Sequence, residues 1–204
     1  MESCPNIILN SDTSENVAYN ITNFPAYIKK GQLSSYPDFR AVSHWHDDFE
    51  FILILDGQMS YDINGHKISL QTGEGIFVNS RCFHYGYSDS HTECIFICIL
   101  LSPQLLSTNN YFVENYLNHL VQITNFPYQK LSPAIQWQNS ILCNLEALYE
   151  NNLEKIHPFT ILEKTSHILG LLFDNMDSFS DNKQNMMTLL ALTAMIGYVQ
   201  KKLL

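Results

Sequence analysis

The first half of the chain alternates between hydrophobic and polar residues with a period of two, which is the period of a β-strand. Short segments with this pattern follow one another closely, and Gly, Ser, Asp or Asn bounds most of them. The pattern predicts strands at residues 17–21, 26–29, 49–55, 58–63, 66–70, 75–79, 83–87 and 93–101. Many short strands at even spacing predict a closed barrel or a sandwich, because open sheet edges must be paired or covered.

Two dipeptides between these strands predict tight hairpin turns. Asp56-Gly57 follows the apolar run at 49–55, and Asn64-Gly65 separates two alternating segments. Such dipeptides readily adopt the positive φ angles that two-residue hairpins require. The chain is therefore expected to fold back on itself repeatedly, so that residues distant in sequence meet.

The hydrophobic period changes from two to about 3.6 residues near Ser102. Ser-Pro pairs at 102–103 and 132–133 each combine a good helix cap with a favoured first helical residue. The pattern predicts a short helix after Pro103 and further helices at 111–123, at 133–149, from 158 onward and at 185–204. The stripes of the helices at 133–149 and from 158 onward are too apolar for both to face water. We therefore expect one helix to pack on the barrel and another to meet its copy in a homodimer.

These patterns divide the chain into four parts. We expect a flexible polar arm at 1–16, a β-barrel at 17–101, a helical extension at 102–184 and a terminal helix at 185–204. The chain stops inside this last helix without a glycine cap or a polar tail. That ending favours a fragment cut before a further domain.

Composition and charge narrow the class of protein. The chain has 204 residues, of which 46% are hydrophobic and 15% charged, so it can form a full core. Its formal net charge of -9 and the lack of a basic cluster exclude direct nucleic-acid binding by this segment. The start lacks a signal peptide, and the longest apolar run, at 95–101, is too short to cross a bilayer. Five cysteines without a CxxC motif fit reduced thiols, so we expect a cytoplasmic protein.

Four residues form the candidate site: His44, His46, Glu50 and His84. The first three share one parity, so in an extended segment their side chains point to the same side of a sheet, and the turns bring His84 to them. Three imidazoles and a carboxylate can bind a divalent metal such as Zn, Ni, Mn or Fe. In the alternative, these side chains hydrogen-bond to one another or to the backbone, and the pocket is free for an organic ligand.

The other reactive side chains give weaker signals. Arg40, Arg81, Tyr85 and Tyr87 are of types that serve catalysis, but such residues are common at the loop edges of any barrel. Cys94 and Cys98 lie in an apolar strand, where a thiol behaves as a small hydrophobic group. Trp45 has the opposite parity to the two histidines beside it, and we expect it to pack between barrel and helix. No residue is predicted to be catalytic.

The spacing of these residues resembles that of a known family. The run His44-x-His46-xxx-Glu50-xxxxxx-Gly57 resembles the first cupin motif, and Gly73-xxxxx-Asn79-xxxx-His84 resembles the second in spacing. Asn79-Ser80-Arg81 stands where cupins typically have Pro-x-Gly. The HWHDxxE phrase, the hairpins and the following helices are more similar still to the amino-terminal sensing domain of AraC-type transcriptional regulators. The segment 195–200 is similar to the one that precedes the paired helix-turn-helix units of that family, and those units are absent here.

This resemblance implies an α+β fold, in which a cupin-like double-stranded β-helix barrel precedes a helical dimerisation region. It implies that a small-molecule effector, often a sugar or another small metabolite, binds near the four site residues without a required cofactor. In the intact regulator the effector controls DNA binding by a C-terminal helix-turn-helix domain, and this chain contacts neither DNA nor a membrane. The competing hypothesis is a cupin metalloenzyme that acts on a small sugar-like or aromatic substrate.

Overall fold

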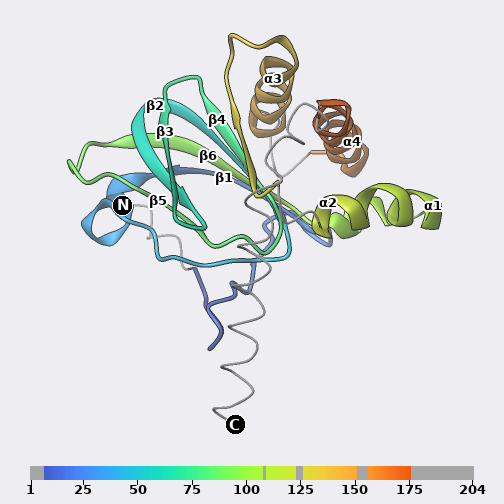
Figure 1. Cartoon of the computed structure of the whole chain (residues 1–204), viewed down its shortest axis with the longest axis horizontal. Helices are drawn as coiled ribbons and strands as arrows, with labels where there is room; N and C mark the ends of the chain where they lie inside the picture. The colour runs from blue at the N-terminus through green and yellow to red at the C-terminus, as the bar shows by residue number, and fades with distance from the viewer. Residues whose placement is uncertain (1–6, 108, 123–125, 151–155, 176–204) are drawn as a thin grey trace, which may run out of the picture.

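The computed structural model describes residues 7–107, 109–122, 126–150 and 156–175 (Figure 1). Its centre is a seven-stranded antiparallel sheet in the order β1-β6-β2-β4-β7, with β3 and β5 paired to the other half of β2. The strands are β1 Ala26–Gln32, β2 Phe49–Ile63, β3 His66–Gln71, β4 Gly75–Val78, β5 His84–Tyr87, β6 Cys94–Leu101 and β7 Tyr128–Leu131. Two short 3₁₀ turns, Leu33–Ser35 and Pro37–Phe39, follow β1. The expected α+β fold, a cupin-like barrel followed by helices, is confirmed.

Strand β2 joins the two halves of the barrel, because it pairs with four other strands. It runs through Asp56-Gly57, where the register with β6 shifts and Gly57 has a φ of 81°. The predicted hairpin at Asp56-Gly57 is therefore wrong, since the positive φ serves a β-bulge that bends a continuous strand. The predicted hairpin at Asn64-Gly65 is confirmed, with φ values of 51° and 85° between β2 and β3.

We expect Gly57→Ala to destabilise the protein more than Gly65→Ala does. Both glycines have a positive φ, which costs an alanine about 1–2 kcal/mol. A Cβ at Gly57 would lie 2.3 Å from the backbone oxygen of Glu93, whereas a Cβ at Gly65 has nothing within 4 Å. Urea denaturation should therefore show an extra loss of about 1 kcal/mol or more for Gly57→Ala, and equal losses would contradict the bulge clash.

Two further strand assignments differ from the sequence pattern. The segment 17–21 is not a strand; Ile21 forms only an isolated bridge with Phe24. Strand β7 lies within the part expected to be wholly helical, and it pairs with β4 along its full length. It has four residues, too few to show a period, so its pairing with β4 and not its own sequence determines its conformation.

The helical part follows β6. Ser102 caps a 3₁₀ turn at Pro103–Leu106 by accepting a hydrogen bond from the backbone of Gln104, as predicted. Next come α1 Asn110–Phe112, a π-helical turn at Val113–Leu117, and α2 Asn118–Gln122, followed after β7 by α3 Gln136–Glu150 and α4 Pro158–Asn175. The predicted helices before residue 176 are thus confirmed, the second with a π-helical interruption. The predicted helix at 185–204 and most of the polar linker before it lie outside the described residues.

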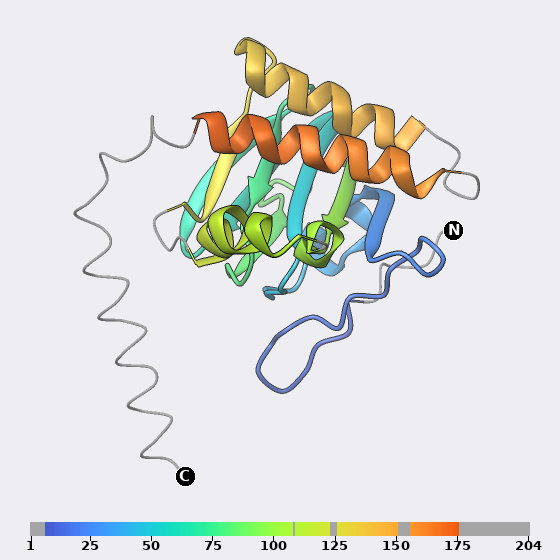
Figure 2. The ribbon, with the colours of Figure 1, turned by 90° about the vertical axis from the view of Figure 1, so that its right-hand side faces the viewer.

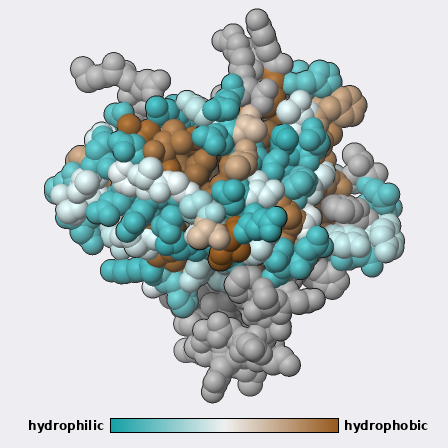
Figure 3. All heavy atoms as spheres, turned by 90° about the horizontal axis from the view of Figure 1, so that it is seen from above, coloured by the Kyte–Doolittle hydropathy of each residue, from teal (hydrophilic) through white to brown (hydrophobic). Residues whose placement is uncertain are grey.

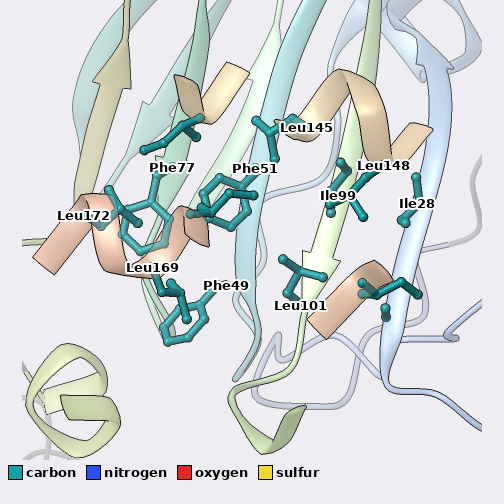
Figure 4. Close-up of a cluster of buried hydrophobic side chains, with 14 of the residues drawn as sticks. Ile28, Phe49, Phe51, Phe77, Ile99, Leu101, Leu145, Leu148, Leu169 and Leu172 are labelled. Carbon is teal, nitrogen blue, oxygen red and sulfur yellow. The ribbon is translucent and has the colours of Figure 1, made fainter. Parts of the chain in front are cut away.

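Helices α3 and α4 lie side by side across one face of the sheet (Figure 2). Their buried residues meet Phe49, Phe51 and Phe77 from the sheet (Figure 4). Both apolar stripes are thus buried within one chain, so the premise that one of them needs a second copy to cover it is wrong. No helix in the described part of the chain is long and apolar enough to span a membrane.

The opposite face of the sheet lines the barrel interior. Phe49, Phe51 and Leu53 of β2 point toward the helices, while Ile52 and Ile54 belong to a second cluster of buried residues inside the barrel. Glu50 shares the parity of this second set and therefore points inward.

The surface seen from above is mainly polar, with smaller apolar areas between polar side chains (Figure 3).

Candidate functional site

The four predicted site residues meet inside the barrel. One ligand atom from each of His44, His46, Glu50 and His84 lies within 4.8 Å of the others, and all four residues are buried. The backbones of His44 and His84 exchange two hydrogen bonds, of 3.2 and 2.9 Å, which bring the start of β5 against the segment that enters β2. Their predicted convergence is confirmed.

Each histidine ring is oriented by its own local backbone. The Nδ1 atoms of His44, His46 and His84 lie 2.9, 3.0 and 2.8 Å from the carbonyl oxygens of Val42, Asp48 and Cys82. A carbonyl oxygen only accepts hydrogen bonds, so each Nδ1 carries the proton and donates it. Each Nε2 therefore faces the centre of the cluster, and it carries a lone pair there whenever the ring is neutral.

Glu50 provides the negative charge of the cluster. Its Oε2 lies 3.5 Å from His46 Nε2 and 3.4 Å from His84 Nε2, and its Oε1 accepts a hydrogen bond from the hydroxyl of Tyr61. Burial opposes ionisation, but the adjacent rings of His84 and His46 hold the pKa of Glu50 well below its usual range. Burial, and the charge of Glu50, raise the pKa of Tyr61 and of Cys98, so both remain neutral donors beside a carboxylate.

This donor set fits a divalent metal ion. The Nε2 atoms of His46 and His84 are buried without a hydrogen-bond partner among the described residues, which is unfavourable for a polar atom in a core. Glu50 Oε2 lies 3.5 and 3.4 Å from these two nitrogens, but a ring that carries its proton on Nδ1 alone cannot donate to it, so mutual hydrogen bonding satisfies them only when the rings are doubly protonated. Imidazole lone pairs and a carboxylate are ligands of Zn, Ni, Mn and Fe, and a backbone carbonyl on the other ring nitrogen is a common support for such ligands.

A fifth polar residue at the site, Glu15, was not found from the sequence. Its Oε2 lies 3.4 Å from His44 Nε2, and its side chain is 13% exposed. The backbone N–H of Glu15 donates to the carbonyl of Trp45 at 2.8 Å, and Trp45 Nε1 donates to the carbonyl of Asp12 at 3.1 Å. Trp45 thus holds the N-terminal segment, and its predicted packing against a helix is wrong. Neither parity nor a motif links Glu15 to the site, because the contact joins segments that are not neighbouring strands.

A cavity of about 860 Å³ opens next to the cluster. Its wall contains His44 and Glu50 of the predicted site, together with Glu15 and Ala18 from the N-terminal segment. Most of the remaining wall is aromatic or aliphatic, including Tyr27, Tyr36, Ile52, Met59, Phe96 and Leu100. This volume suits a small organic molecule, and the wall combines these apolar surfaces with polar and charged side chains.

The weaker candidates have structural roles. Arg40 and Arg81 form surface ion pairs with Asp89 and Asp47, at 2.7 and 2.6 Å. Cys94 is fully buried, and burial raises its pKa to about 12, which prevents it from acting as a thiolate nucleophile.

Comparison with known proteins places this arrangement among regulators. The family described as AraC-like ligand binding domain matches residues 31–172. A relative from Bacillus subtilis (strain 168), the uncharacterized HTH-type transcriptional regulator YdeC, is 28% identical over 137 residues, which are 67% of this chain and 47% of that protein. The chain thus spans about half the length of this curated relative.

Solved structures with a similar arrangement include cupins. A cupin protein from Bacteroides fragilis matches with 26% identity and a TM-score of 0.34, over 38% of this chain and 66% of that one. A salicylate 1,2-dioxygenase from Pseudaminobacter salicylatoxidans matches with 21% identity and a TM-score of 0.34, over 37% of this chain and 22% of that one.

Proposed function

Because this chain belongs to the AraC-like ligand-binding domain family, we propose that it senses a small-molecule effector on behalf of a transcriptional regulator. The observation that carries the proposal is the cavity of about 860 Å³, whose wall combines apolar surfaces with polar and charged side chains. Such a wall can select one molecule by a few polar contacts while apolar burial provides affinity. DNA binding then belongs to a helix-turn-helix domain outside this chain, because the Bacillus subtilis relative, of which this chain spans about half, is described as an HTH-type transcriptional regulator.

Sensing requires that the effector favours one arrangement of the protein over another. Residues 7–20 of the N-terminal segment are suited to such a change, because polar contacts fix them and none of them belongs to a cluster of buried core residues. Glu15 faces His44, the hydroxyl of Tyr19 donates to Asp48, and the side chain of Asn20 bonds to both backbone groups of Ile28. An effector in the cavity touches this segment directly, since Glu15 and Asn20 line the wall.

We also propose that His44, His46, Glu50 and His84 hold a divalent metal in the sensing state. The two unpartnered ring nitrogens support this assignment, because a bound cation satisfies both. When bound, such an ion supplies a Lewis-acidic anchor for an oxygen atom of the effector. The protein itself orients the three rings through backbone carbonyls and keeps Glu50 ionised.

The same donor set supports a second candidate function, a cupin metalloenzyme that acts on a small sugar-like or aromatic substrate. An enzyme additionally needs an acid or base that reaches the reacting atoms. Tyr85 lines the cavity and would have to serve as that acid or base. We also propose that the protein is a homodimer, on the basis of family membership, and that it is cytoplasmic, on the basis of its cysteines.

A single experiment separates the sensor from the enzyme. The Zn²⁺-loaded and Fe²⁺-loaded chain is screened against small metabolites by thermal shift, and each molecule that binds is recovered and analysed by mass spectrometry. At 100 times its Kd, an effector should stabilise the fold by about 2.7 kcal/mol. A sensor returns every bound molecule unchanged, whereas conversion of more than one molecule per chain would show an enzyme.

A further inference from the structure

The inner wall of the cavity contains a lysine. Strand β1 alternates so that Ala26 and Ile28 join the core under the helices, while Tyr27 and Lys29 point toward the cavity that both line. The register of the sheet confirms this face, because Lys29 is opposite Cys98, and Cys98 belongs with the residues of the barrel interior. The Sγ of Cys98 lies 3.9 Å from Glu50 Oε2, so the residue opposite Lys29 in the sheet contacts the polar cluster.

Lys29 has no counter-ion among the residues that the structure describes. It is partly buried, yet its ammonium forms neither an ion pair nor a hydrogen bond with any residue that the structure describes. Lys130 shows the contrast, since it pairs with Glu74 at 2.9 Å and also donates to a backbone carbonyl. A partly desolvated ammonium with three unused donors is a ready partner for an anion.

The summed charge of the groups around the cavity indicates which net charge of a ligand is favoured. Two carboxylates, Glu15 and Glu50, line the wall beside Lys29. Lys30 also borders the cavity, but it is exposed and lies on the opposite face of β1. With a divalent cation in the cluster, the cation and Lys29 together exceed the two carboxylates by one positive charge. One monoanion neutralises this excess, whereas a neutral molecule leaves it uncompensated.

The other side chains of the wall indicate the chemistry of the rest of the ligand. Around Lys29 and Glu50 lie Ile52, Met59 and Phe96, all buried, and the phenol of Tyr27, whose pKa is raised by burial. Gly31 leaves room for the ring of Phe96, because a Cβ there would lie 2.7 Å from it. These surfaces favour an aromatic or aliphatic group over a fully hydroxylated one, whose hydroxyls need more polar partners than this wall has.

We propose that the effector is a small monocarboxylate with an apolar body, whose carboxylate lies between Lys29 and the cation held by the histidine cluster. The inference rests on the proposed sensing function and names the chemical class of its ligand. It assigns specificity to Lys29, a residue outside the cupin-like motif.

The test uses three acids and their amides: benzoate, 3-phenylpropionate and octanoate, each compared with the neutral amide of the same shape. Binding to the Zn²⁺-loaded 204-residue chain is measured by calorimetry. At least one acid should bind more tightly than its amide, and Lys29→Gln should weaken that acid by about 10- to 100-fold while leaving the amide unchanged. Lys67→Gln is the matched control, because Lys67 is exposed and is not among the residues that line the cavity, and it should have no comparable effect. Removal of Zn²⁺ should also weaken the acid.

Several results would overturn the assignment. Equal affinity for acids and amides, equal effects of Lys29→Gln on both, or no binding of any acid at about 10 mM would each refute a carboxylate effector. If neutral molecules from the metabolite screen bind and return unchanged while the acids fail, the sensing function stands and only the ligand class is wrong. If a bound molecule is converted, the sensing function itself fails.

Discussion

Replacing His84 by Gln is expected to lower the affinity of the protein for Zn²⁺ or Ni²⁺ by more than about 100-fold. Loss of an outer partner of a ligand typically costs about 10–100-fold, and His84 is proposed as a direct ligand. Its ring is 1% exposed and its Nε2 faces Glu50 at 3.4 Å, so no side chain from solvent can replace it easily. Glu50→Gln, which keeps the size of the side chain, should have an effect of the same order. Titration against a chromophoric chelator measures both.

The matched control for this prediction is His91→Gln. His91 is exposed, and its ring stacks on Phe39 at 5.4 Å, away from the cluster. This variant should bind metal as the unaltered protein does. The metal assignment would be refuted if the unaltered protein failed to bind Zn, Ni, Mn or Fe(II) at micromolar concentration, or if His84→Gln and His91→Gln bound equally well.

Replacing Phe77 by Ala is expected to destabilise the fold by about 3–5 kcal/mol. Phe77 on β4 is fully buried, and its ring lies 5.9, 5.1 and 5.9 Å from the rings of Phe49, Phe51 and Phe126. These residues belong to the layer that joins the sheet to α3 and α4 (Figure 4), so a cavity there cannot be filled by solvent-exposed groups. Urea denaturation monitored by circular dichroism measures the change in the free energy of unfolding.

Phe83→Ala provides the comparison for the core variant. Phe83 is 46% exposed, so its removal should change the free energy of unfolding by about 1 kcal/mol or less. A loss below about 1 kcal/mol for Phe77→Ala would show that the helices do not pack on the sheet in this way.

The fold could be predicted where local signals and tertiary contacts agree. Asn64-Gly65 forms the expected hairpin because the strands on either side have the length and register of a tight turn. Asp56-Gly57 has the same turn chemistry, but the strand continues through it, since β6 pairs with β2 on both sides of the bulge. The positive φ of Gly57 could therefore be predicted from the local sequence, whereas pairing with β6 decides that it forms a bulge and not a hairpin.

The helical half shows the same division. The apolar stripes of α3 and α4 were evident from their period, and the structure buries both. Which surface covers them was not evident, because an apolar stripe predicts that one face of a helix is buried but does not identify the surface that buries it. Strand β7 was missed for a related reason, since four residues between a proline and a serine have no measurable period.

By itself, the amino-acid sequence determined the residue types and the spacing of His44, His46, Glu50 and His84, and hence that a metal-binding or ligand-binding cluster could form. Alternation within a strand and turn chemistry act over a few residues, so they can be read from the order of the chain. Only the tertiary structure decided that each Nδ1 faces a carbonyl, that Glu15 reaches His44, and that Lys29 lines the cavity. These features are contacts between segments or choices of side-chain direction, and distance along a chain does not determine distance in space.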